Sequence, residues 1–175
     1  MKNFWLPALA LTLCLTLPMG IIPAGAVNSA TAVEAIQALG IITGDSTGDL
    51  NLTSPVTRAE FVTMLTAASS YKDSIGSGSG VSLFKDVKSD HWASEYIKLA
   101  VEQGWMTGYV DGTFRPDNQI TLEEACTALL KMLGYDSSTL AGSYPSAQLS
   151  KASSVGLRDD VDAVQGEALT RQDCV

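Results

Sequence analysis

The chain has 175 residues, of which 46% are hydrophobic and 17% are charged, and its formal net charge is −8. This size suits one domain or a short array of small repeats. Because 19 acids face 11 bases, the chain is a poor candidate for binding nucleic acid or an anionic membrane surface. Its single histidine and three cysteines show no metal-ligand spacing, so we expect no metal and no cofactor.

Residues 1–26 have the pattern of a secretory signal peptide. One lysine precedes an apolar stretch, and Ala24-Gly25-Ala26 supplies the small residues that signal peptidase requires. The apolar stretch is shorter than the roughly 20 residues that a membrane-spanning helix needs. We therefore predict that this segment is removed on export and that the remaining chain has no membrane contact.

Two segments of the chain repeat at a constant offset of 64 residues. Residues 39–60 read LGIITGDSTGDLNLTSPVTRAE, residues 103–124 read QGWMTGYVDGTFRPDNQITLEE, and their alignment needs no gap. A weaker third copy, SSVGLRDDVDAVQGEALTRQD, covers residues 153–173 with a shorter loop. Internal repetition predicts an array of similar units that bury their apolar faces against one another.

The copies predict how the chain is organised. Gly- and Ser-rich residues between the first two copies indicate a flexible linker. Few residues follow Thr170, so we expect a truncated protein or the front of a longer one. The predicted segments are a signal peptide (1–26), a first repeat shortened at its N-terminus (27–75), the linker (76–83), the most complete repeat (84–136) and a third repeat truncated at its C-terminus (137–175).

Each copy is predicted to hold two helices. In the second copy we expect Ser89 or Asp90 to cap the first helix, and a loop rich in turn residues to lead to a second helix that starts at Thr121. No segment alternates convincingly as a strand, so the predicted class is all-α, with short helices and long ordered loops. The apolar stripe of the first helix comprises Trp92, Ala93, Tyr96, Ile97, Ala100 and Val101.

Each copy also carries the signal of a helix N-terminal capping box. In this motif the threonine hydroxyl accepts from the N3 amide, and the acid reaches back to the N-cap amide. Such a cap contributes roughly 1 kcal/mol. The three signals are Thr57-x-x-Glu60, Thr121-x-x-Glu124 and the weaker Thr170-x-x-Asp173.

Capping does not explain Arg58 and Arg171, which follow two of the threonines. A cation in the first turn is mildly unfavourable, because the helix N-terminus carries a partial positive charge. Two explanations stay open: a salt bridge to a nearby acid, or an anion site in which the guanidinium lies beside free helix-start N–H groups. Leu122 stands at the same position of the second copy, so we expect that folding does not require the arginine.

Residues 84–125, FKDVKSDHWASEYIKLAVEQGWMTGYVDGTFRPDNQITLEEA, resemble the S-layer homology (SLH) domain. That family's pattern runs Phe-x-Asp-Val, Trp-Ala, Gly-x-x-x-Gly-x-x-Asp-Gly-x-Phe-x-Pro and Thr-Arg-Ala-Glu. With the other copies, the resemblance covers most of residues 30–175. It implies tandem two-helix repeats in a pseudo-threefold, three-pronged spindle, whose third repeat is here incomplete. It also implies non-covalent binding to secondary cell-wall polymers, often polysaccharides with ketal-linked pyruvate.

The resemblance also implies glycan-binding residues in the grooves between prongs. They are Arg58, Arg171, Asp86 and Trp92, although Trp92 could instead pack in the core. The second copy departs from the pattern at Leu122, and neither of the other copies has a clear Asp-Val and Trp-Ala segment. At most two grooves therefore have an arginine.

Two weaker patterns suggest other chemistry. SLFK at residues 82–85 has the Ser-x-x-Lys spacing of penicillin-recognising enzymes, but the partner motifs are missing. DSTGDLN at residues 45–51 begins like a calcium loop, but Val56 stands where the acid at position twelve is needed. We expect no catalytic residues.

The predicted function is attachment of an exported protein to the bacterial cell wall through an anionic, pyruvylated secondary cell-wall polysaccharide. The expected location is the cell wall or cell surface (S-layer). Two alternatives remain open: a self-associating envelope module that binds no glycan, and the N-terminal anchor of a longer surface enzyme.

Overall fold

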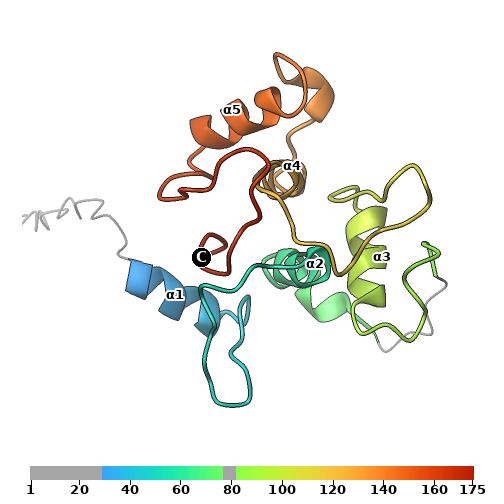
Figure 1. Ribbon diagram of the computed structural model, residues 1–175, viewed down its shortest axis with the longest axis vertical. Coiled ribbons are helices and arrows are strands. Elements are labelled where there is room, and N and C mark those ends of the chain that lie inside the picture. The colour runs from blue at the N-terminus through green and yellow to red at the C-terminus, as the bar shows by residue number, and fades with distance from the viewer. Residues whose placement is uncertain (1–28, 77–81) are drawn as a thin grey trace, which may run out of the picture.

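The computed structural model describes residues 29–76 and 82–175 (Figure 1). The predicted signal peptide and most of the predicted linker lie outside these residues. Within the described ranges the chain is helical and has isolated β-bridges but no strand, so the all-α prediction is confirmed. The helices are α1 (Ser29–Ala38), α2 (Arg58–Ala67), η1 (Lys72–Ser74), α3 (Ser94–Glu102), α4 (Leu122–Met132), η2 (Ser137–Thr139) and α5 (Ser146–Ser154).

The three copies meet at a closed ring of backbone hydrogen bonds, which forms the hub of the fold. Val56 N donates to Leu169 O (2.9 Å), Leu169 N to Ile120 O (3.0 Å), and Ile120 N to Val56 O (2.9 Å). All three side chains are buried. Since each residue directly precedes a capping-box threonine, the ring relates the copies by pseudo-threefold symmetry.

A second set of hydrogen bonds runs around this hub in the opposite sense. The amide after each capping-box threonine donates to a carbonyl of the next copy. At α2 and α4 these backbone groups would otherwise be unpaired at a helix start, so the copies satisfy one another's termini. The pairs are Arg58 N with Asn118 O (2.8 Å), Leu122 N with Glu167 O (3.0 Å) and Arg171 N with Ser54 O (2.9 Å).

The arms around the hub combine helices from different copies. α2 packs against α3, and α4 packs against α5. Figure 1 shows these pairs as separate arms, with α1 and the C-terminus in the third. α3 and α5 correspond at an offset of 52 residues, from Ser94 to Ser146. On this offset Tyr144 is the third-copy counterpart of Trp92.

The start of α3 differs from the prediction. The helix begins at Ser94 with Ala93 at the N-cap, and no side chain caps it, so neither Ser89 nor Asp90 has that role. The His91 ring instead accepts from Ala93 N (3.1 Å), within a turn that precedes the helix. Trp92 therefore lies outside the helix and is 60% exposed, so its placement on the buried stripe is wrong.

The capping-box residues lie at the starts of α2 and α4. Thr57 Oγ1 accepts from Glu60 N (3.2 Å), and Glu60 Oε2 accepts from Thr57 N (2.8 Å). At α4, Glu124 Oε2 accepts from Thr121 N (3.3 Å), as a capping box requires. The third-copy pair makes both capping-box bonds. The caps at Thr57 and Thr121 fix the residues at which α2 and α4 begin beside the hub.

Candidate functional site

Arg58 inserts its guanidinium into the loop of the second copy, which connects α3 to α4. Its side chain is only 3% exposed and stacks over the rings of Phe114 (4.7 Å) and Tyr109 (5.0 Å). Nε donates to Phe114 O (3.0 Å), Nη2 donates to Thr107 O (3.1 Å), and Nη1 pairs with Glu124 Oε1 (2.8 Å). The salt-bridge explanation therefore describes Arg58.

Arg171 inserts into the loop of the first copy in the same way. Its Nε donates to Leu50 O and its Nη2 to Thr43 O, both at 2.7 Å. These carbonyls are the first-copy equivalents of those that Arg58 uses. Among the described residues, however, no carboxylate forms an ion pair with Arg171.

The helix-start amides beside Arg58 are already occupied. At α2, Arg58 N donates to Asn118 O (2.8 Å), Ala59 N to Pro116 O (2.9 Å), and Glu60 N to the capping threonine. The free N–H groups that the anion-site explanation requires are therefore already paired at α2. The reason is tertiary, because the neighbouring copy supplies the acceptors.

Leu122 does not show that the fold tolerates loss of the arginine. Its side chain is 1% exposed, and a guanidinium from elsewhere serves the corresponding loop of the third copy. Arg158 Nη2 donates to Ala163 O (3.4 Å), the equivalent of the Phe114 carbonyl. Each of the three loops thus receives an arginine, although in the third copy it comes from the loop's own repeat.

Asp86 also acts on the loop of the second copy. Its two carboxylate oxygens accept from Phe114 N (2.8 Å) and Arg115 N (2.7 Å). Asp86 and Arg58 therefore bind the two ends of the same residue, one at its amide and one at its carbonyl. This geometry gives Asp86 a structural task in shaping the loop.

Gly108 lets that loop pass close to an aromatic ring. A Cβ at this position would lie 2.1 Å from Phe84 Cε1 and 2.8 Å from Thr113 O, which no side chain tolerates. Its first-copy equivalent, Gly44, is equally restricted by the backbone of Gly48 at 2.7 Å. The repeated glycine thus has a packing reason in both loops.

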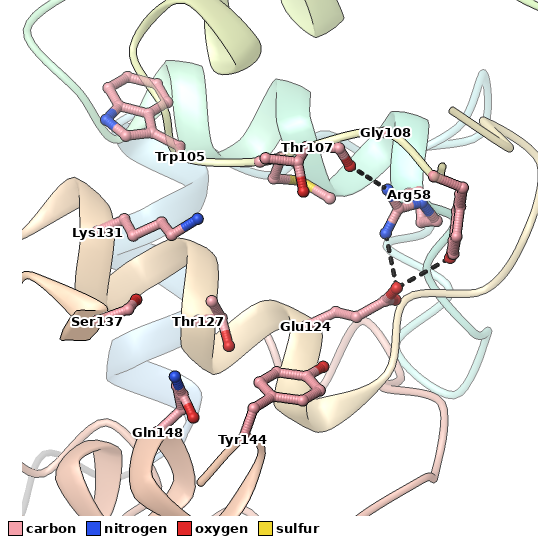
Figure 2. A pocket seen from close by; sticks show the side chains of 12 residues that line it. Arg58, Trp105, Thr107, Gly108, Glu124, Thr127, Lys131, Ser137, Tyr144 and Gln148 are labelled. Carbon is pink, nitrogen blue, oxygen red and sulfur yellow. Dashed lines mark hydrogen bonds and ion pairs between the residues drawn. The ribbon is translucent and has the colours of Figure 1, made fainter. Parts of the chain in front are cut away.

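A cleft opens beside Arg58, between α4 and α5 (Figure 2). Its volume is about 420 Å³, within the range of roughly 300–1,000 Å³ that is usual for small-molecule sites. Three of its residues, Glu124, Thr127 and Lys131, lie on one face of α4 at helical spacing. The others are Arg58, Trp105, Met106, Thr107, Gly108, Tyr109, Ser137, Tyr144 and Gln148.

Glu124 organises one end of this cleft. Its Oε1 accepts from both Arg58 Nη1 (2.8 Å) and the Tyr109 hydroxyl (3.0 Å). Burial, with the nearby Glu124 charge, raises the pKa of Tyr109, so its hydroxyl keeps its proton at neutral pH. Figure 2 shows Lys131, Ser137 and Gln148 on the side of the cleft away from Arg58.

The predicted site residues do not form one cluster. Arg58 lines the cleft, Asp86 supports the loop behind it, and Arg171 lies in another loop. Trp92 is exposed and stacks on His91, with ring centroids 5.7 Å apart. Sequence reasoning missed the cleft residues Lys131, Gln148 and Tyr144, although the polar spacing along α4 gave a partial signal for the first.

Comparisons with known proteins identify the repeats. The family model described as the S-layer homology domain matches residues 25–62 and 83–126. These segments belong to the S-layer homology family. The match confirms the resemblance on which the expected spindle rests, and the hydrogen-bonded hub supplies its pseudo-threefold centre.

Similar proteins are surface proteins of bacteria. A middle cell wall protein of Brevibacillus brevis is 30% identical over 81% of this chain, and a cell surface protein of Thermoanaerobacter kivui is 30% identical over 82%. A cellulosome-anchoring protein of Acetivibrio thermocellus is 43% identical over 45%. The chain spans only 13%, 18% and 17% of these relatives' lengths. The S-layer homology domains place it at the bacterial cell wall or cell surface and support attachment there, as predicted.

Two further observations concern only residues 29–76 and 82–175. No helix there is long and apolar enough to cross a membrane. No group of three or more His, Cys, Asp or Glu residues is placed to hold a metal ion. In the loop that begins like a calcium site, Asp45 accepts instead from Thr47 and Asn51 of the same loop.

Proposed function

We propose that the chain attaches an exported protein to the bacterial cell wall by binding an anionic, pyruvylated secondary cell-wall polysaccharide. The observation that carries this proposal is the cleft between α4 and α5. Two cations, Arg58 and Lys131, and a single acid, Glu124, line it, in a chain with a formal net charge of −8. A local positive surplus in an acidic protein favours an anionic ligand.

The other lining groups suit a sugar. Hydroxyl and amide side chains line the cleft together with aromatic rings, and such groups match the hydroxyls and the apolar ring faces of a saccharide. Tyr144 is 58% exposed at this cleft, and its counterpart Trp92 is 60% exposed on the neighbouring arm. We propose that both rings stack on sugar units.

The remaining predicted residues act through the loops. We propose that Arg58, Arg171 and Asp86 support glycan binding by fixing the loop backbones that wall the grooves, because their polar atoms bind those backbones. We propose no catalytic role for this chain. The similarity to an anchoring protein supports an attachment function without naming the polymer.

The test is retention on purified wall sacculi with and without their secondary polymer. We expect the exported chain to sediment with intact sacculi and to remain in solution after the polymer is removed chemically. Trp92→Ala should weaken retention while leaving the circular dichroism spectrum unchanged. Equal retention on stripped sacculi, or polymer-independent oligomers in sedimentation velocity, would favour the self-associating module instead.

A further inference from the structure

The helix α1 lacks the partner helix that its counterparts have. α3 packs against α2 and α5 packs against α4, but among the described residues no helix covers α1 to a comparable extent. In α3, Ile97 and Ala100 are buried, whereas their counterparts in α1 at the 64-residue offset, Val33 and Ile36, stay partly exposed. One face of α1 is therefore apolar without being covered by a helix.

The pseudo-symmetry of the hub indicates what kind of partner would cover α1. At two of the three hub positions, α2 and α4 begin directly after the capping threonines Thr57 and Thr121. At the third position Thr170 and Asp173 make the same capping bonds, and a turn rather than a helix follows over residues 171–174. Figure 1 shows the C-terminus in the same arm as α1. The element that would complete this arm is therefore a helix of the α2 and α4 type.

An apolar groove occupies this arm. Its volume is about 350 Å³, and α1, α2 and α4 all contribute to its lining, with Ile36 on α1. Phe61 and Leu65 on α2, and Ala125 and Leu129 on α4, are four positions apart, so each pair lies on one face of its helix. Two such faces form a groove into which the side-chain ridge of a third helix packs.

The charged residues of this groove are acidic. Asp159 and Asp173 are the only charged residues that line it within the described part of the chain, and Asp160 lines an adjoining hollow together with both. A partner surface with basic residues beside an apolar stripe complements this arrangement. Amphipathic helices bind such grooves through apolar residues at positions i, i+3, i+4 and i+7.

We propose that the groove between α1, α2 and α4 docks one amphipathic helix of a partner protein, with the apolar spacing of α2 and α4 and with basic residues beside its apolar face. Docking covers the apolar face of α1 and gives this arm the helix pair that the other arms have. None of the residues that line this groove also lines the cleft between α4 and α5. The interface is therefore separate from the proposed glycan site and does not depend on glycan binding.

The probe is a labelled peptide with the sequence of residues 121–133, in which Glu123→Lys supplies the basic flank. A second peptide keeps Glu123, and a third has the residues of the probe in scrambled order. Fluorescence anisotropy under reducing conditions measures binding to the exported chain. The groove variants are Ile36→Asp and Val161→Asp, and the matched control is Val110→Asp, which adds the same charge at a fully exposed residue. Circular dichroism and thermal melts verify folding.

We expect the chain to bind the basic peptide and not the scrambled one. The peptide that keeps Glu123 should bind more weakly, because its acid meets the aspartates of the groove. Ile36→Asp and Val161→Asp should each weaken binding about tenfold, since each places a charge against the apolar face of the docked helix. Val110→Asp should bind as the wild-type chain does, and retention on intact sacculi should be the same for all three variants.

Other results would overturn the proposal. Binding that neither groove variant weakens relative to Val110→Asp would place the helix elsewhere on the chain. Concentration-dependent dimers of the chain alone in sedimentation velocity, abolished by Ile36→Asp, would show that a second copy covers the groove. A peptide that does not bind when free, but raises the melting temperature above that of the scrambled sequence when fused after Val175, would show that the groove takes a helix of the same chain. Each of these three results excludes docking of a partner's helix in this groove.

Discussion

Replacing Arg58 with leucine tests the role that the structure assigns to this arginine. The change copies the residue found at Leu122, but without the second guanidinium that Arg158 supplies to the third copy. It leaves the Glu124 carboxylate without its cation and two loop carbonyls without their donors. We therefore expect the loop of the second copy to loosen and the whole chain to lose stability.

The size of the expected loss in unfolding free energy follows from the burial of the ion pair. Breaking a buried ion pair by removing one partner costs about 3–5 kcal/mol. The Arg58 side chain is 3% exposed, but that of Glu124 is 23% exposed and partly solvated, which favours the lower end, about 3 kcal/mol. Since domains are stable by only about 5–15 kcal/mol, this loss is a large fraction of the total.

The assay is urea unfolding followed by circular dichroism, with Arg115→Leu as the matched control. Arg115 pairs with Asp111 at 3.1 Å, but their side chains are 43% and 45% exposed, so its loss should cost about 1 kcal/mol or less. Adding Glu124→Gln to Arg58→Leu should restore about 1 kcal/mol, because it removes the uncompensated charge. If Arg58→Leu costs no more than Arg115→Leu, the reasoning is refuted.

Three further predictions follow from exposure and from pKa values. Trp92→Ala should change the free energy of unfolding by less than about 0.5 kcal/mol, since the ring is 60% exposed; a larger loss in urea melts would mean that the ring packs in the core. Hydrogen bonds, first from the Thr47 side chain, hold the pKa of Asp45 at about 2, so the stability it provides is present above its ordinary pKa near 4 and is lost as pH falls toward 2. Asp45→Asn should flatten the melting temperature over that interval, and an unchanged curve would contradict the assignment. Burial raises the pKa of Cys174 to about 12, so it should react slowly with a thiol reagent at pH 8, and reaction at the rate of a free thiol peptide would contradict this.

Local signals predicted the repeat and the places where its second helices begin. Thr57 and Thr121 stand at the N-caps of α2 and α4 because a cap depends on residues three positions apart. Trp92 was misplaced for a related reason. Helical spacing shows which residues share a face once a helix exists, but the chain becomes helical only at Ser94.

The choice between the two explanations for Arg58 depended on contacts that local signals do not contain. Its partners Phe114 and Glu124 lie 56 and 66 residues away, and they meet it only because the copies close into a ring. The same closure occupies the helix-start amides with carbonyls of the neighbouring copy. No pattern within one repeat predicts which groups the next repeat will present.

The sequence by itself determined the helical class and the S-layer homology segments at residues 25–62 and 83–126, because repetition, caps and turn residues act over short distances. Only the tertiary structure decided which residues of different copies share a cleft. Lys131 belongs to the second copy and Gln148 to the third, and both line one cleft because α4 packs against α5. Burial and pairing are properties of that packing, and they distinguish the paired Arg58 from Lys131, which forms no ion pair among the residues that the structure describes.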